Sequence, residues 1–180
     1  MTEKTEINIL GCGSSFGVPL SHGIWGNCDK SNPKNQRTRP SILLKKAGKS
    51  ILIDTSPDLR KQLIDNKIDN VGSVIYTHSH ADHIHGINDL RTISMINRKK
   101  IPIYADKITL ETLQTSFSYL FSKSSTHGYE PILNANVLNA NNIEIEGFKI
   151  EIIRQNHGNI DSYGFIFDSK IAYNLDIKYF

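Results

Sequence analysis

The stretch "THSHADHIHG", residues 77–86, holds four of the seven histidines of this 180-residue chain and an aspartate among them. It is internal and unevenly spaced, unlike a tag or a monotonous histidine tract. It follows the apolar run "VGSVIY", which predicts a buried strand that ends at the cluster. Residues two apart in extended backbone point to the same side, so His78 and His80 can bind one ion together. Asp82 and His83 follow on the next turn, where they can bind a second ion beside it.

This mixture of imidazole and carboxylate donors suits zinc, and also manganese or iron. The pattern H-x-H-x-D-H after an apolar strand favours a metal site over a polar loop with scattered histidines. Two ions about 3.5–4 Å apart are a known arrangement for holding phosphodiesters and activating water. We therefore predict two divalent metal ions, zinc or manganese, as cofactors.

The composition predicts one domain over residues 1–180, with 38% hydrophobic and 22% charged residues. No apolar run is long enough to span a membrane. The N-terminus "MTEKTEINIL" lacks an apolar signal core, so we expect a cytoplasmic protein. Two cysteines, Cys12 and Cys28, are too few for a disulfide framework and are expected to be reduced. The net charge of +3 fits an anionic substrate but is too small to indicate nucleic acid binding.

Apolar patterns outside the cluster predict strands toward both ends of the chain and helices between them. Residues 56–65 read as a helix capped by Ser56, residues 87–96 recur at helical spacing, and residues 106–121 read as one capped helix. Strands are expected within residues 7–11, 41–46, 50–54, 71–76, 100–105, 141–158 and 163–176. The expected class is α+β, a two-layer sheet core flanked by helices.

Several stretches together resemble the metallo-β-lactamase superfamily and, more closely, its phosphoribosyl cyclic phosphodiesterases (PhnP-like proteins). They are "ILGCGSSFGVP", "NPKNQRTRPS", "ILIDTSPDLR", "YTHSHADHIHGINDLR", "IPIYAD", "QNHGNIDSYGF" and "AYNLDI", and they run along essentially the whole chain. The resemblance implies an αββα sandwich with a two-metal site at one edge.

The resemblance also implies which residues hold the metals. The ligands of the first ion are His78, His80 and His157; those of the second are Asp82 and His83; Asp176 bridges both. Asp54 is expected beneath the metals, where it holds a ligand histidine by its second ring nitrogen.

The expected chemistry is attack on phosphorus by a water whose pKa the two ions lower to near neutrality. Asp82 would orient this nucleophile and take its proton. His85 would face the substrate, donate a proton to the leaving oxygen, or only cap the following helix. The loop "GCGSSFG", with Ser14 at its centre, offers backbone N–H groups to phosphate, although a tight turn explains it equally. His127 is a further candidate substrate contact.

Two departures from the family pattern qualify these expectations. The cyclic phosphodiesterases carry a cysteine cluster for a structural zinc after the glycine-rich loop; here only Cys28 and His22 stand there, so we predict no structural zinc. The sequence ends at Phe180, before the strands, helices and final histidine ligand of the family's second half. We therefore expect a C-terminally incomplete sandwich and a weak or empty second metal site. A homo-oligomer would cover the exposed outer layer.

The leading hypothesis is a metal-dependent phosphodiesterase acting on a small cyclic phosphate, with no membrane and no nucleic acid as partner. One alternative is RNA 3′-end processing by a nuclease of the same fold, but the sequence shows no insertion for the protruding arm of such enzymes. Another alternative is a metal-binding protein without catalysis, because the last ligand is absent.

Overall fold

A computed structural model describes residues 4–123, 128 and 130–178, and two β-sheets form its centre. The larger sheet has six strands in the order β1 (Glu6–Gly11), β2 (Ser41–Lys46), β3 (Lys49–Ile53), β4 (Ser73–Ile75), β5 (Ile101–Ala105) and β6 (Leu133–Val137). The smaller sheet has the order β10 (Ile171–Tyr173), β9 (Ile160–Phe167), β8 (Phe148–His157) and β7 (Asn142–Ile145). The larger sheet is antiparallel from β1 to β3 and parallel from β3 to β6.

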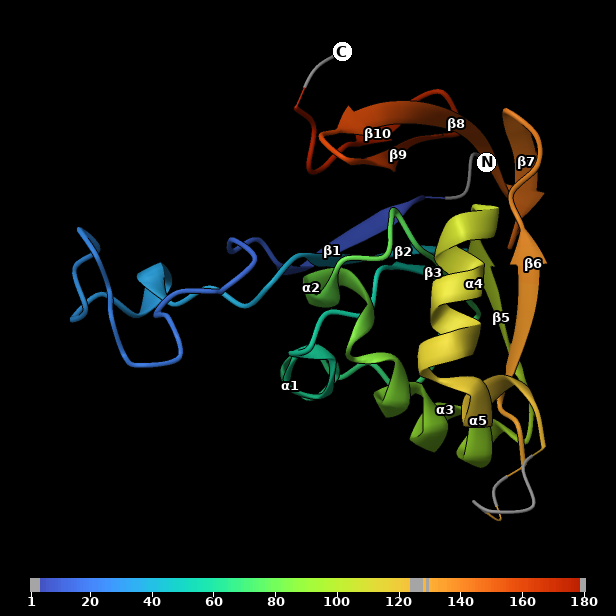
Figure 1. Ribbon diagram of the computed structural model, residues 1–180, viewed down its shortest axis with the longest axis horizontal. Helices are drawn as coiled ribbons and strands as arrows, with labels where there is room; N and C mark the ends of the chain where they lie inside the picture. The colour runs from blue at the N-terminus through green and yellow to red at the C-terminus, as the bar shows by residue number, and fades with distance from the viewer. Residues whose placement is uncertain (1–3, 124–127, 129, 179–180) are drawn as a thin grey trace.

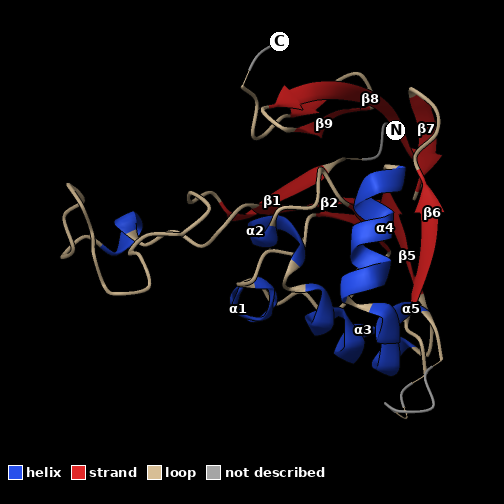
Figure 2. Cartoon of the chain, viewed as in Figure 1, coloured by secondary structure: helices blue, strands red, loops and turns tan. Residues whose placement is uncertain are grey.

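The larger sheet is covered on both faces, which explains why its central strands are continuously apolar. Along β3, Leu52 faces the helices, whereas Ile51 and Ile53 face the smaller sheet, where Phe148 and Phe165 pack against them. Figures 1 and 2 show the helices on one side of this sheet and β8–β10 on the other. The predicted α+β sandwich is thus confirmed. Within the described residues, no helix covers the outer face of the smaller sheet.

The helices are α1 (Leu59–Asp65), α2 (Ala81–Ile84), α3 (Leu90–Asn97), α4 (Lys107–Ser116) and α5 (Ser118–Phe121). Short 3₁₀ turns lie at Pro33–Asn35 and Ile87–Asp89. None of the described helices combines the length and apolarity needed to cross a lipid bilayer.

Two details of the predicted helices were wrong. The first helix begins at Leu59 after Asp58, because the Ser56 hydroxyl accepts the backbone N–H of Asp58 in a turn that precedes the helix. The helix expected over residues 106–121 breaks at Phe117, where α4 ends before α5 begins.

Residues 12–40, here called the excursion, project away from the body between β1 and β2 (Figure 1). Its base is closed by the bridge between Val18 and Arg37 and by the 2.8 Å bond from Gly13 N to Thr38 O. The projection of this segment was not predicted. The sequence did not reveal it because this segment contains glycines and polar residues without any periodic apolar pattern. Phe16, at its base, is 76% exposed.

Candidate metal centre

The ends of two parallel strands determine where the histidine cluster lies. Since β3 and β4 pair in parallel, the residues that follow them, Asp54 and Thr77, emerge at the same edge of the sheet. Asp54 has a left-handed backbone, φ 61°, which aspartate tolerates better than most residues. The bond from Tyr163 N to Thr77 O, 3.0 Å long, joins the smaller sheet to the same point.

Asp54 is completely buried and accepts three hydrogen bonds. The donors are Thr77 N at 2.8 Å, Thr77 Oγ1 at 2.9 Å and His83 Nδ1 at 2.7 Å. A buried carboxylate is tolerated when it is bonded in this way. The contact expected between Asp54 and a histidine of the cluster is therefore present. It turns the other ring nitrogen of His83 toward the remaining histidines.

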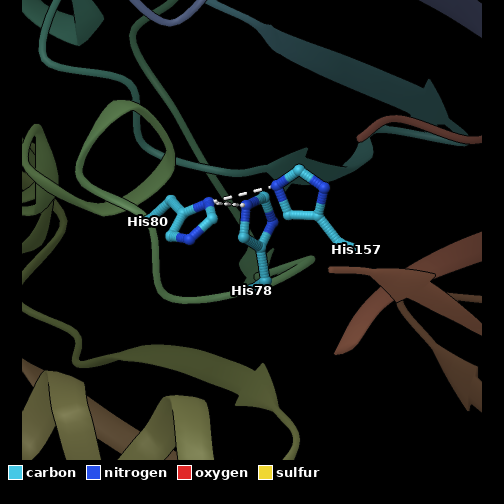
Figure 3. Close-up of side chains that lie close together, drawn as sticks. All are labelled: His78, His80 and His157. Carbon is cyan, nitrogen blue, oxygen red and sulfur yellow. Dashed lines mark hydrogen bonds between the residues drawn. The ribbon is translucent and has the colours of Figure 1, made fainter. Parts of the chain in front are cut away.

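Three imidazoles meet at the first group of donor atoms, as Figure 3 shows. His80 Nδ1 lies 3.0 Å from His78 Nε2 and 3.2 Å from His157 Nε2. Nitrogen atoms bound to one tetrahedral zinc at the usual bond length are roughly 3.3 Å apart. The spacing thus fits three ligands of a single ion after small adjustments.

A second group of donor atoms shares His78 with the first and adds His83 and Asp176. Asp176 Oδ2 lies 2.7 Å from His83 Nε2 and 3.8 Å from His78 Nε2, while Asp82 Oδ2 lies 3.3 Å from His83 Nε2. Despite these short distances, His83 Nε2 is a buried atom with no aligned hydrogen-bond partner. A cation among these atoms would satisfy the nitrogen and both carboxylates, so the donor set fits a second divalent ion.

The segment that carries Asp176 is fixed to the outer face of the smaller sheet. Ser162 Oγ donates to Asp176 O at 3.1 Å, and Lys178 N donates to Asn156 O at 2.8 Å. The Asn174 side chain bonds to Gln155 over Gly164, where a Cβ atom would lie only 2.0 Å from Asn174 Oδ1. Asp176 itself has a left-handed φ of 53°. Such backbone is retained where the surrounding structure fixes it, often at functional sites.

The two groups differ in protonation. Burial, together with His83 and His80, lowers the pKa of His78 to about 3, and burial also lowers that of His80. For His83, burial alone would lower the pKa, but Asp54, Asp176 and Asp82 raise it to about 12. His78 and His80 therefore present neutral nitrogens to a metal, whereas His83 must first lose a proton.

The remaining predicted site residues are His85, Ser14 and His127. His85 is exposed, belongs to neither group of donors and packs edge-on against Phe117, with ring centroids 6.0 Å apart. Ser14 lies in a turn in which its carbonyl accepts Gly17 N at 2.8 Å. Its neighbour Ser15, which sequence reasoning missed, has its side chain close enough to Asp82 to lower the pKa of that carboxyl. His127 lies outside the described residues.

The chain is similar to known proteins both in sequence and in structure. A family model described as "Beta-lactamase superfamily domain" matches residues 49–180. A crystal structure of a diphosphatase from the PhnP family matches with a TM-score of 0.77 and 32% identity, covering 91% of this chain and 61% of that one.

Two curated relatives match in sequence. The octanoyltransferase of Porphyromonas gingivalis is 32% identical over 171 residues, which are 94% of this chain but 34% of that protein. The ribonuclease Z of Bradyrhizobium diazoefficiens is 27% identical over 149 residues, 81% of this chain and 49% of that protein. The chain therefore spans between a third and a half of these proteins, and their names describe longer molecules.

The Asp54 contact predicts how the second donor group responds to mutation. Asp54→Asn should lower metal affinity there by about 10–100-fold, since a carboxylate behind a ligand histidine fixes its orientation and basicity. Competition against a coloured chelator measures this. Asp168→Asn is a matched control, because that carboxylate pairs with Lys46, 2.7 Å away, at the other end of β8. Equal metal affinity in the Asp54 variant and the native protein would refute the assignment.

The raised pKa of His83 predicts different pH dependence for the two groups. Below a pKa of about 12 the metal-free protein keeps the proton on His83, so a metal binding there must release it. Affinity at that group should rise about tenfold per pH unit, whereas affinity at the first group should change less between pH 7 and 8. Calorimetry in buffers of different ionisation enthalpy counts the protons released. No proton release on filling the second group would contradict this prediction.

Proposed function

This chain belongs to the β-lactamase superfamily, and we propose a function on that basis. Within that family it acts as a metal-dependent hydrolase of a small phosphoric diester, most closely a cyclic phosphate. The observation that carries the proposal is the pair of donor groups joined by His78, with the unpartnered Nε2 of His83 between two carboxylates.

Two divalent ions, zinc or manganese, would be held by His78, His80 and His157 on one side and by His83, Asp82 and Asp176 on the other. When bound, they supply positive charge to phosphate oxygens and lower the pKa of water. The names of two relatives, a diphosphatase and a ribonuclease, refer to cleavage of phosphate linkages and support this reaction class.

Asp82 has the protonation state that such a reaction needs. Burial alone would raise its pKa, but His83 and the Ser15 hydroxyl hold the pKa well below its usual range. Ionised at neutral pH, Asp82 accepts a hydrogen bond from the attacking water, orients it toward phosphorus and receives its proton. Asp54 acts through His83, which it holds in place.

The leaving oxygen needs a proton donor, and we assign this role to His85. Its exposed ring rests on Phe117 just beyond α2, so a substrate held at the donor groups would approach it from solvent. Ser15, at the base of the excursion, lies near Asp82, and we propose its neighbour Ser14 as a phosphate contact.

RNA 3′-end processing is a second candidate, and the excursion is the feature that favours it. The excursion carries four basic residues, Lys30, Lys34, Arg37 and Arg39, against one acidic residue, Asp29. Arg39, however, is already paired with Asp58 at 2.8 Å. A filter-binding assay with precursor transfer RNA at low and high salt tests this candidate, because phosphate contacts weaken steeply as salt rises. Failure to bind RNA at low salt would remove it.

The leading proposal predicts a specific loss. In the metal-loaded protein, His78→Ala should abolish hydrolysis of a cyclic ribose phosphate and lower bound metal, because both donor groups contain His78. The loss of rate should exceed about a hundredfold. His22→Ala is the matched control, since His22 is exposed in the excursion. Its metal content and rate should equal those of the native protein.

Three outcomes would be informative. Full metal occupancy in the His78 variant would refute the ligand assignment. Bound metal without turnover of cyclic phosphates or aryl phosphodiesters by the native chain would favour a metal-binding protein without catalysis. Turnover that requires metal and is lost in the His78 variant alone supports the proposed function.

A further inference from the structure

A pocket of about 690 Å³ lies directly beside the donor groups and is not used by the chemistry proposed above. Its walls come from Ser79, the start of α4, the end of β6 and the hairpin of β8 and β9. Such a volume is typical of small-molecule sites. We call it the side pocket.

The side pocket shares a wall with the metal ligands. Ser79, which lines the pocket, stands between His78 and His80 in the chain. Gly158 and Asn159, which also line it, directly follow His157. A substituent on a phosphate held at the donor groups therefore has this pocket as its neighbour.

Much of the lining is apolar and open to solvent. Ile108 on α4 is 69% exposed and Val137 at the end of β6 is 47% exposed, and both line the pocket together with Leu138 and Ile160. A ligand that covers these apolar side chains removes their surface from water, which makes binding in the pocket more favourable.

The charged groups of the pocket are already paired. Arg154 donates from Nε to Asp161 Oδ2 at 2.9 Å. Asp106 accepts the backbone N–H groups of Ile108 and Thr109 and places its own negative charge at the start of α4, which disfavours an anion there. Lys107 lies 3.9 Å from Glu111. Two acidic and two basic side chains line the pocket, so their charges balance, which favours an uncharged occupant.

Among the polar groups of the pocket, Tyr163 is suited to such an occupant. Tyr163 is half-buried, and burial and the nearby Asp106 raise the pKa of its hydroxyl. The hydroxyl therefore stays protonated at neutral pH and can donate or accept a hydrogen bond at the pocket wall.

We propose that the side pocket binds an uncharged, flat ring of nucleobase or aryl size carried by the diester, with its face on Ile108 and Val137 and its polar edge at Tyr163. This proposal rests on the proposed function, since the phosphate is taken to lie at the donor groups. It makes Ile108, Val137 and Tyr163 residues that determine specificity.

Two esters with the same leaving group test the proposal by kinetics. Thymidine 5′-(p-nitrophenyl phosphate) should show at least a tenfold higher kcat/KM than methyl p-nitrophenyl phosphate. Ile108→Trp, which fills the pocket, should remove this advantage. Ile96→Trp is the matched control, because Ile96 is likewise an exposed helical isoleucine, 72% exposed, but lies on α3. Loss of rate on both esters in the Ile108 variant would also support a ring site, occupied then by the nitrophenyl group.

Binding provides a readout that does not need turnover. By calorimetry, the metal-loaded protein should bind thymidine 5′-monophosphate at least tenfold more tightly than inorganic phosphate. Ile108→Trp should abolish the difference without changing phosphate affinity, and Ile96→Trp should preserve it. If no ester is hydrolysed but this pattern holds, the proposed function fails and the ring site stands. Equal affinities for the two ligands, or an Ile108 variant that behaves like the native protein, would overturn the side-pocket proposal.

Discussion

The buried carboxylate of Asp54 is the constraint on which the centre depends. It ties the ends of β3 and β4 together through Thr77 and fixes His83 through a 2.7 Å bond to Nδ1. An unpaired carboxylate at this depth would strongly destabilise the fold. The three hydrogen bonds therefore fix the positions of the donors as well as that of Asp54. The orientation of His83, and with it the direction of its Nε2 toward Asp82 and Asp176, follows from this single buried charge.

The same carboxylate makes the two donor groups chemically unequal. His78 and His80 have lowered pKa values and offer neutral nitrogens, whereas His83 is surrounded by Asp54, Asp82 and Asp176 and retains a proton. A metal that binds the first group does not have to displace a proton from His78 or His80, whereas a metal that binds the second group must displace one from His83. This asymmetry in proton release has one cause, the negative charge that Asp54, Asp82 and Asp176 place around the His83 ring.

The sandwich brings binding surfaces to the metal centre from distant parts of the chain. Ser15 reaches Asp82 from the base of the excursion, and the start of α4 faces the hairpin of β8 and β9 across the side pocket. Loops and strand ends at one edge of a rigid core commonly serve this purpose. The centre presents imidazole and carboxylate donors, while the side pocket and the excursion present surfaces that differ in charge and apolarity.

The sequence by itself determined the local elements of the centre. The spacing of His78, His80, Asp82 and His83 follows from one strand and one turn, and the apolar runs predicted both sheets because alternation and periodicity are local properties of the chain. His157 and Asp176 were expected only through resemblance, since His157 meets His80 across 77 residues. The break at Phe117, the exposure of Ile96, the contact of Ser15, the excursion and the side pocket were decided only by tertiary structure. Each depends on how separate elements pack, and neither spacing nor composition encodes that packing.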